Sequence, residues 1–124
     1  MENRKDKINK FSDLIVWQKA HQLVLMIYKL TRDFPKTETY SLVDQMRRAV
    51  VSITSNIAEG FGRQYYKEKI QFYYQANGSL IELENQILIA RDLDYFKPKQ
   101  QLYDLCLEVH KLLQGLITSS KKRL

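Results

Sequence analysis

Hydrophobic residues recur at spacings of three and four along most of the chain, and this periodicity constrains the fold more than any other feature. Residues three or four positions apart lie on one face of an α-helix, so each series predicts an amphipathic helix with one buried face. We predict helices over about 13–34, 42–60, 65–92 and 98–119. Their apolar series are Trp17, Ala20, Val24, Ile27 and Thr31; Leu42, Met46, Ala49, Ile53 and Ile57; Tyr66, Ile70, Tyr73, Leu80, Leu83 and Ile87; and Leu102, Leu105, Val109, Leu112 and Leu116.

Local signals at the helix starts support these bounds. Ser12 or Asp13 can cap the first helix, because a short side-chain oxygen accepts a hydrogen bond from a free backbone N–H. Ser41 and Asp44 resemble a capping box at the start of the second helix. Pro98 suits the first position of the fourth helix, where its missing N–H costs nothing.

Signals at the helix ends are equally local. Pro35 disfavours helical geometry at the residue before it, so we expect the first helix to stop there. Gly60 and Gly62 are expected to end the second helix. Gly78, together with Ala76, suggests that another helix comes close to the middle of the third.

The overall composition suits one small helical domain. The chain has 124 residues, 44% of them hydrophobic, with only 4 Gly and 2 Pro. Four helices joined by short turns pack most economically as an all-α, antiparallel up-down-up-down four-helix bundle. We assign residues 1–11 to a flexible N-terminal segment, 12–120 to the bundle and 121–124 to a basic tail.

The sequence predicts a soluble, cytoplasmic protein with no membrane contact. The single cysteine, Cys106, cannot form an intrachain disulfide, which suits a reducing compartment. The polar start of the chain does not resemble a signal peptide, and no run approaches the roughly 20 apolar residues of a membrane span.

The apolar faces of the helices are wider than one core needs. Val51, Tyr74, Ile81 and Leu88 lie outside the main series of their helices. These side chains either thicken a single core or pack against another subunit. We favour the second interpretation and predict a homo-oligomer.

The second helix carries an unusual polar face of small hydroxyl and amide side chains. One interpretation is a buried or interfacial network, in which Arg48 forms a forked contact with Glu59, Glu82 or Glu84. The other is a phosphate site that uses Arg47, Arg48 and Arg63. We favour the network, with the members Arg48, Ser52, Asn56, Glu59, Glu82 and Glu84.

Catalytic and metal-binding patterns are weak. Neither His21 nor His110 has the Glu three residues earlier that a carboxylate-bridged di-iron bundle requires. Cys106 lies in the apolar register of its helix, where a thiol is usually inert. The segment 60–62 is too short for a phosphate-binding glycine loop. We therefore predict no enzyme activity, no metal and no cofactor.

Basic residues are predicted to converge on one end of the bundle. The formal net charge is +6, which permits binding to phosphates. In an up-down bundle the start of the third helix and the end of the fourth lie at the same end. The candidate nucleic-acid-binding residues there are Arg63, Lys67, Lys69, Lys121, Lys122 and Arg123.

Several segments resemble one bacterial family of four-helix bundles, first known from proteins encoded in intervening sequences of 23S ribosomal RNA genes. The resemblance is close over residues 11 to about 96 and looser in the fourth helix. The segments are FSDLIVWQKA at 11–20, YKLTRDFP at 28–35, QMRRA at 45–49, SITSNIAEG at 52–60 and GSLIELE at 78–84.

This resemblance implies an up-down bundle that assembles as a ring-like homopentamer. It also implies distant kinship to the accessory variability protein of diversity-generating retroelements, a basic pentamer that binds a reverse transcriptase and nucleic acid. This chain departs from that relative in carrying only +6 per subunit. The resemblance supplies no catalytic residues.

These observations lead to two functional hypotheses. The first is a non-enzymatic, homo-oligomeric module that binds structured RNA, DNA or a nucleoprotein through its basic end. The alternative is a protein-interaction scaffold, such as an accessory subunit of a reverse transcriptase.

Overall fold

The computed structural model describes residues 7–124, in which the chain is helical and contains no strand. The prediction of an all-α fold with four α-helices is confirmed for this part of the chain. The elements are the 3-10 helix η2 (Phe11–Asp13), α1 (Ile15–Thr31), the 3-10 helix η3 (Lys36–Glu38), α2 (Leu42–Gly62), α3 (Tyr66–Asp92) and α4 (Gln100–Lys121).

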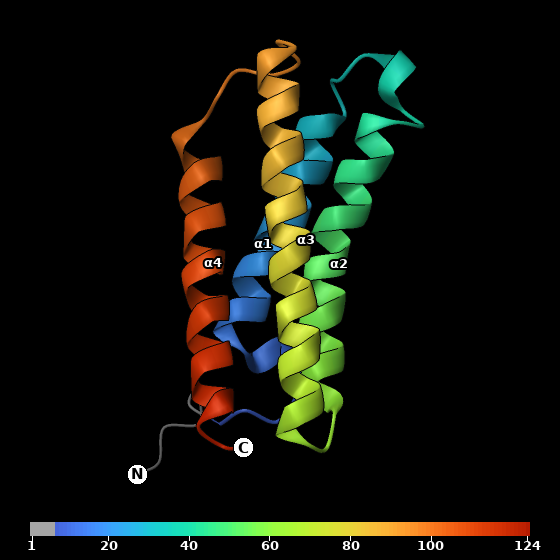
Figure 1. Cartoon of the computed structure of the whole chain (residues 1–124). Helices are drawn as coiled ribbons and strands as arrows, with labels where there is room; N and C mark the ends of the chain where they lie inside the picture. Colours follow the sequence, from blue (N-terminus) through green and yellow to red (C-terminus); the bar gives the residue numbers. More distant parts are fainter. Residues whose placement is uncertain (1–6) are drawn as a thin grey trace.

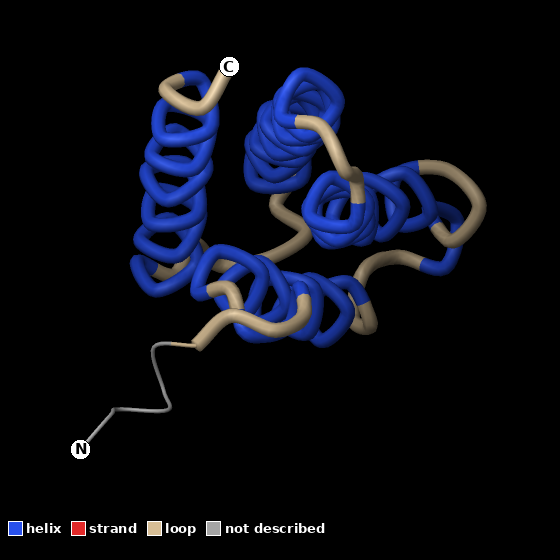
Figure 2. The backbone as a smooth tube through the Cα atoms, turned by 90° about the horizontal axis from the view of Figure 1, so that it is seen from below, coloured by secondary structure: helices blue, strands red, loops and turns tan. Residues whose placement is uncertain are grey.

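The four α-helices pack around one core. In Figure 1 the start of α1, the α2–α3 turn and the end of α4 lie at the lower end, whereas the α1–α2 and α3–α4 connections lie at the upper end. Each helix contacts the next one in the chain, and α4 also contacts α1, so α1 and α3 lie diagonally across the bundle. The end-on view in Figure 2 shows the helices arranged around a common centre.

The core contains most residues of the predicted apolar series, but the register differs in places: Trp17, Val24, Leu112 and Leu116 are only partly buried, whereas Leu23 and Leu113, outside those series, are fully buried. Fully buried side chains come from every helix, which leaves a single continuous apolar interior. They include Leu23 and Ile27 from α1, Ile53 and Ile57 from α2, Leu80 and Leu83 from α3, and Val109 and Leu113 from α4. None of the helices in residues 7–124 has the length and apolar character to cross a bilayer.

The start of α1 differs from the prediction. The helix begins at Ile15, and no side chain caps it. The Asp13 carboxylate instead accepts backbone N–H groups of Asn9 and Lys10 at 3.0 and 3.1 Å, which lowers the pKa of Asp13. Asp13 therefore ties the preceding segment to η2. The predicted flexible segment 1–11 lies largely outside the described residues.

The starts of α2 and α4 also correct the local predictions. Ser41 precedes α2, but its hydroxyl donates to the Glu38 carboxylate instead of capping the helix. Glu38 itself accepts the backbone N–H of Leu42 at 3.3 Å. Helix α4 begins at Gln100, so Pro98 lies in the connection before it.

Gly60 and Gly78 have roles different from those predicted. Gly60 lies buried inside α2, where an added Cβ would stand 2.6 Å from Cε1 of Tyr73. This glycine allows Tyr73 to pack closely and does not end the helix. Gly78 is exposed with nothing within 4 Å of an added Cβ, so the predicted close approach at Gly78 is wrong. Ala76 is buried.

Candidate nucleic-acid interface

The end of α4 lies against the first part of α3 through cations placed over aromatic rings. The guanidinium of Arg123 stands 5.7 Å from the ring centre of Tyr66, and the ammonium of Lys121 stands 5.1 Å from that of Tyr74. Such contacts are attractive because the ring face carries negative charge density. They hold residues more than 40 positions apart in the sequence at one end of the bundle.

The α2–α3 turn brings two further cations to the same end. Arg63 lies over the ring of Phe72 at 4.7 Å, and its Nη2 donates to Glu59 at 3.1 Å. Lys69 lies near the rings of Phe61 and Tyr66, at 5.4 and 5.8 Å. We call Arg63, Lys67, Lys69, Lys121, Lys122 and Arg123 the basic end.

Lys69 has a structural role within the basic end. Its Nζ donates to the backbone carbonyl oxygens of Phe61 at 2.6 Å and Gly60 at 3.4 Å, which satisfies acceptors at the C-terminus of α2. Partial burial lowers the pKa of this ammonium, because burial disfavours the charged form. Lys67 and Lys122 are exposed and form no ion pair with any residue in 7–124.

Tyr65 differs from the other aromatic residues near the basic end. It precedes α3, is 62% exposed and has no ring contact within the described residues. The rings of Phe72, Tyr66 and Tyr74 are each covered by a cation. Tyr65 is therefore the most exposed of these aromatic groups, and no cation lies over its ring within the described residues.

A small polar cluster joins α2 to α3. The hydroxyls of Ser52 and Ser79 are 2.8 Å apart and share a hydrogen bond. Asn56 donates from Nδ2 to the carbonyl oxygen and the hydroxyl of Ser52, at 2.8 and 3.0 Å. The structure thus brings together Ser52 and Asn56, two residues of the predicted network, and adds Ser79, which the prediction left out.

The charged members of the predicted network do not join this cluster. Arg48 is highly exposed on α2, and its Nε donates to Asp44 at 3.0 Å, one turn earlier, instead of reaching Glu59, Glu82 or Glu84. Glu59 pairs with Arg63, and Glu82 is exposed. Glu84 is half-buried and close enough to Cys106 to raise the pKa of its thiol. The cluster therefore contains only neutral groups. Its hydroxyl and amide groups form hydrogen bonds with one another, and no buried charge takes part.

The alternative phosphate site of Arg47, Arg48 and Arg63 does not form. Arg47 binds the end of α1: its Nε donates to the Thr31 hydroxyl at 3.0 Å, its Nη2 donates to the Tyr28 carbonyl at 3.3 Å, and its guanidinium covers the Tyr28 ring. Arg63 follows the other end of α2, about 24 Å away at 1.5 Å per residue.

The cysteine is an unreactive packing group. Cys106 is buried, and burial, with a smaller effect from Glu84, raises the pKa of the thiol to about 12. Such a thiol stays protonated at neutral pH and is a poor nucleophile. Residues 7–124 contain no cluster of three or more side chains that could hold a metal ion.

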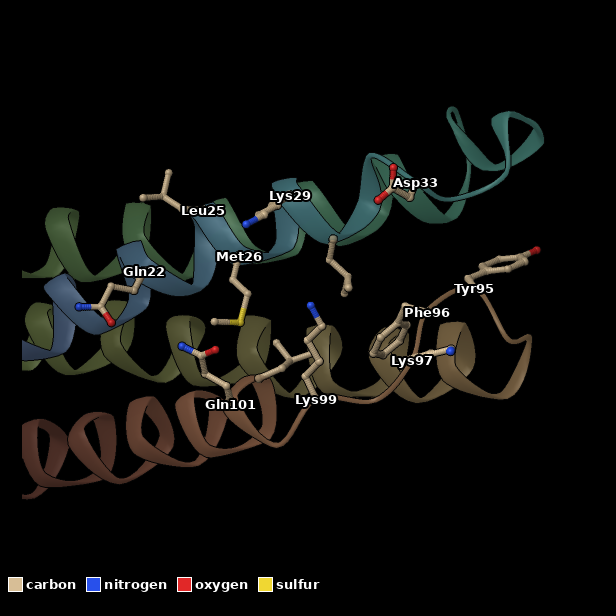
Figure 3. A pocket seen from close by; sticks show the side chains of 12 residues that line it. Gln22, Leu25, Met26, Lys29, Asp33, Tyr95, Phe96, Lys97, Lys99 and Gln101 are labelled. Atoms are coloured by element: carbon tan, nitrogen blue, oxygen red, sulfur yellow. The ribbon is translucent and has the colours of Figure 1, made fainter.

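A groove between α1 and α4, at the end of the bundle opposite the basic end, was not predicted. Its cavity of about 550 Å³ has an apolar lining from Met26, Leu30, Phe96 and Leu102. Figure 3 shows Met26 pointing from α1 toward Gln101 and Lys99 on the α4 side. Periodicity cannot reveal such a groove, because it depends on how far two helix ends separate.

Comparisons with known proteins agree with this fold. A family model described as 23S rRNA-intervening sequence protein matches residues 12–115. No curated protein matches the chain. A crystal structure of a protein of unknown function, from the S23 ribosomal protein family of Bacteroides thetaiotaomicron, is similar with a TM-score of 0.76. It is 21% identical, and the match covers 84% of this chain and 96% of that chain. The chain belongs to the 23S rRNA-intervening sequence protein family.

Proposed function

We propose that this antiparallel up-down-up-down bundle is a non-enzymatic, homo-oligomeric binding module of the cytoplasm that binds structured RNA through its basic end. The observation that carries the proposal is the contact of Arg123 with Tyr66 and of Lys121 with Tyr74. These contacts bring the end of α4 to the cations that follow α2, and the six cations of the basic end outnumber the two carboxylates, Glu59 and Glu68, in residues 59–69 and 121–124. A ring-like homopentamer would repeat this end as a basic annulus.

The chemistry of the basic end favours phosphates over bases. Most of its aromatic rings carry a cation, and Tyr65, the most exposed of them, is the ring that is most open to a base. Phosphate contacts release counterions and are therefore strongly salt-dependent. The family description, which refers to 23S rRNA, makes fragments of that RNA the first ligand to test.

A gel-shift titration with 23S rRNA hairpins at increasing salt tests the proposal. The variant K121A/R123A should bind more weakly, and the slope of log K against log salt should fall by about one for each lost phosphate contact. The matched control R32A/K36A removes two exposed cations at the opposite end and should bind like the wild type. No binding by the wild type at low salt, or equal losses in both variants, would contradict RNA binding through this end.

The exposed apolar side chains favour a second candidate function. Leu25 on α1 and Ile81 on α3 are 58% and 54% exposed, and contiguous apolar patches around such side chains are typical of surfaces that meet another protein. A protein-interaction scaffold, such as an accessory subunit of a reverse transcriptase, would use such a surface. Co-purification with a reverse transcriptase after nuclease treatment, with no shift of free RNA, would favour this alternative.

A further inference from the structure

Among residues 7–124, two surfaces with exposed apolar groups differ in character. The first is the groove between α1 and α4. Its volume of about 550 Å³ lies in the range of clefts that receive a ligand. Lys29, Lys97 and Lys99 lie around it with a single carboxylate, Asp33. None of these three lysines forms an ion pair within residues 7–124.

The second surface is the outer face of the C-terminal half of α3. All its members are exposed, and they follow helical spacing, so they form one continuous stripe. Ile81, Leu88 and Ile89 are 54%, 44% and 42% exposed. We call this surface the α3 outer face, and its members are Ile81, Glu82, Asn85, Leu88, Ile89 and Asp92.

The two surfaces complement each other in shape and charge. The groove is concave and apolar with three lysines and one aspartate around it. The α3 outer face is a convex apolar stripe with two carboxylates, of which Asp92 also accepts from neighbouring Arg91 at 2.9 Å. An amphipathic helix that lays its apolar face in an apolar groove is a common mode of recognition between proteins.

One chain cannot bring these surfaces together. Helices α1 and α3 lie diagonally across the bundle and do not contact each other, and the α3 outer face is directed away from the core. We infer that the α1–α4 groove receives the α3 outer face of a second copy of this chain. The inference rests on the homo-oligomeric function proposed above and names its contact surface.

The contact joins unlike surfaces, which determines the geometry of assembly. Each subunit offers one groove and one α3 outer face, so the contact is head-to-tail, and it closes into a ring if the rotation between subunits allows. A dimer formed by this contact keeps one free groove and one free α3 outer face. Assembly therefore continues beyond two subunits.

Two variants that each lose one surface test the contact. The groove variant is L25E/K99E, and the face variant is I81K/L88K. All four positions are exposed, so both variants should keep the helical circular dichroism of the wild type. Val51, 37% exposed on α2 and outside both surfaces, supplies the control V51E. Light scattering coupled to size exclusion should give the wild-type mass for V51E and the subunit mass of 14.8 kDa for each double variant.

Mixing the two variants gives the sharpest result. The groove variant retains an intact α3 outer face and the face variant an intact groove. An equimolar mixture should therefore form a species of twice the 14.8 kDa subunit mass and no larger one. A mixture that stays at the subunit mass, with both variants folded, overturns the inference. A groove variant that dimerises alone also overturns it, because that behaviour indicates a symmetric contact.

The same measurements separate this inference from the proposed function. Double variants that keep the wild-type mass show that the subunits meet elsewhere, which overturns the contact and leaves the homo-oligomer intact. A wild-type chain that remains a single subunit at high concentration overturns both. A third outcome is that native mass spectrometry finds the wild type as a single subunit with a small anionic molecule bound. That result would give the groove another occupant and would overturn the contact.

Discussion

The contact between α2 and α3 and the contact between α1 and α4 differ in how completely the chain fills them. The contact between α2 and α3 is more extensive than the contact between any other two helices. Small side chains and Gly60 allow this approach, and the Ser52–Ser79 hydrogen bond joins the two helices. Between α1 and α4 the chain leaves the cavity of about 550 Å³. One contact is thus complete within a single chain, whereas the other has room for a partner.

Truncating one large side chain in each region should produce the largest difference. Ile53 is fully buried on α2, so I53A should lower the free energy of unfolding by about 2–5 kcal/mol. Met26 is half-buried and lines the groove, so within a separate subunit M26A loses fewer contacts than I53A and should cost less. Urea unfolding at one fixed subunit concentration measures both. Equal losses would show that the α1–α4 contact is as well packed as the core.

Adding one methyl group at two glycines should shift stability in opposite directions. In G60A the new Cβ would lie 2.6 Å from Tyr73 Cε1 and 2.9 Å from Cδ1, and such overpacking typically costs about 1–3 kcal/mol. In G115A the Cβ meets nothing within 4 Å, so the higher helix propensity of alanine should add about 1 kcal/mol. Thermal unfolding followed by circular dichroism measures both changes. A stabilised G60A would mean that Tyr73 can move aside freely.

The smallest effect concerns Glu38, which holds the upper end of the α1–α4 groove through Tyr95. Its carboxylate accepts hydrogen bonds from Ser41 and, at 2.6 Å, from Tyr95, and these bonds lower the pKa of Glu38. A lowered folded-state pKa contributes stability above the unfolded-state pKa, and this contribution is lost as the pH falls through the folded-state value. The wild type should therefore lose stability with acid, below about pH 4.5, more steeply than E38Q. Parallel acid titrations of the two proteins would contradict this role.

The helices were predictable because their cause is local. The apolar series of α2 places Met46, Ile53 and Ile57 on one face, and all three are fully buried. Helix ends were less predictable, since a cap depends on a competition among nearby polar groups. Ser41 has the side chain of a typical cap, yet its hydroxyl donates to Glu38, which lies in η3.

The candidate site was predictable in position but not in detail. Counting helix directions placed the α2–α3 turn and the end of α4 at the same end, as the structure shows. The ion pairs were not predictable. Several carboxylates are possible partners for Arg48 when only the sequence is known, and the backbone positions decide that Arg48 pairs with Asp44. The role of Lys69 at the end of α2 likewise depends on how tightly the α2–α3 turn folds.

The sequence by itself determined four amphipathic helices, one apolar core and a basic end, because helical periodicity and chain direction depend only on residue order. Only the tertiary structure decided that Gly60 receives Tyr73, that Ser52 binds Ser79 and that α1 and α4 leave a groove. These features depend on the distance between helices, which is set by the packing of side chains from distant parts of the chain.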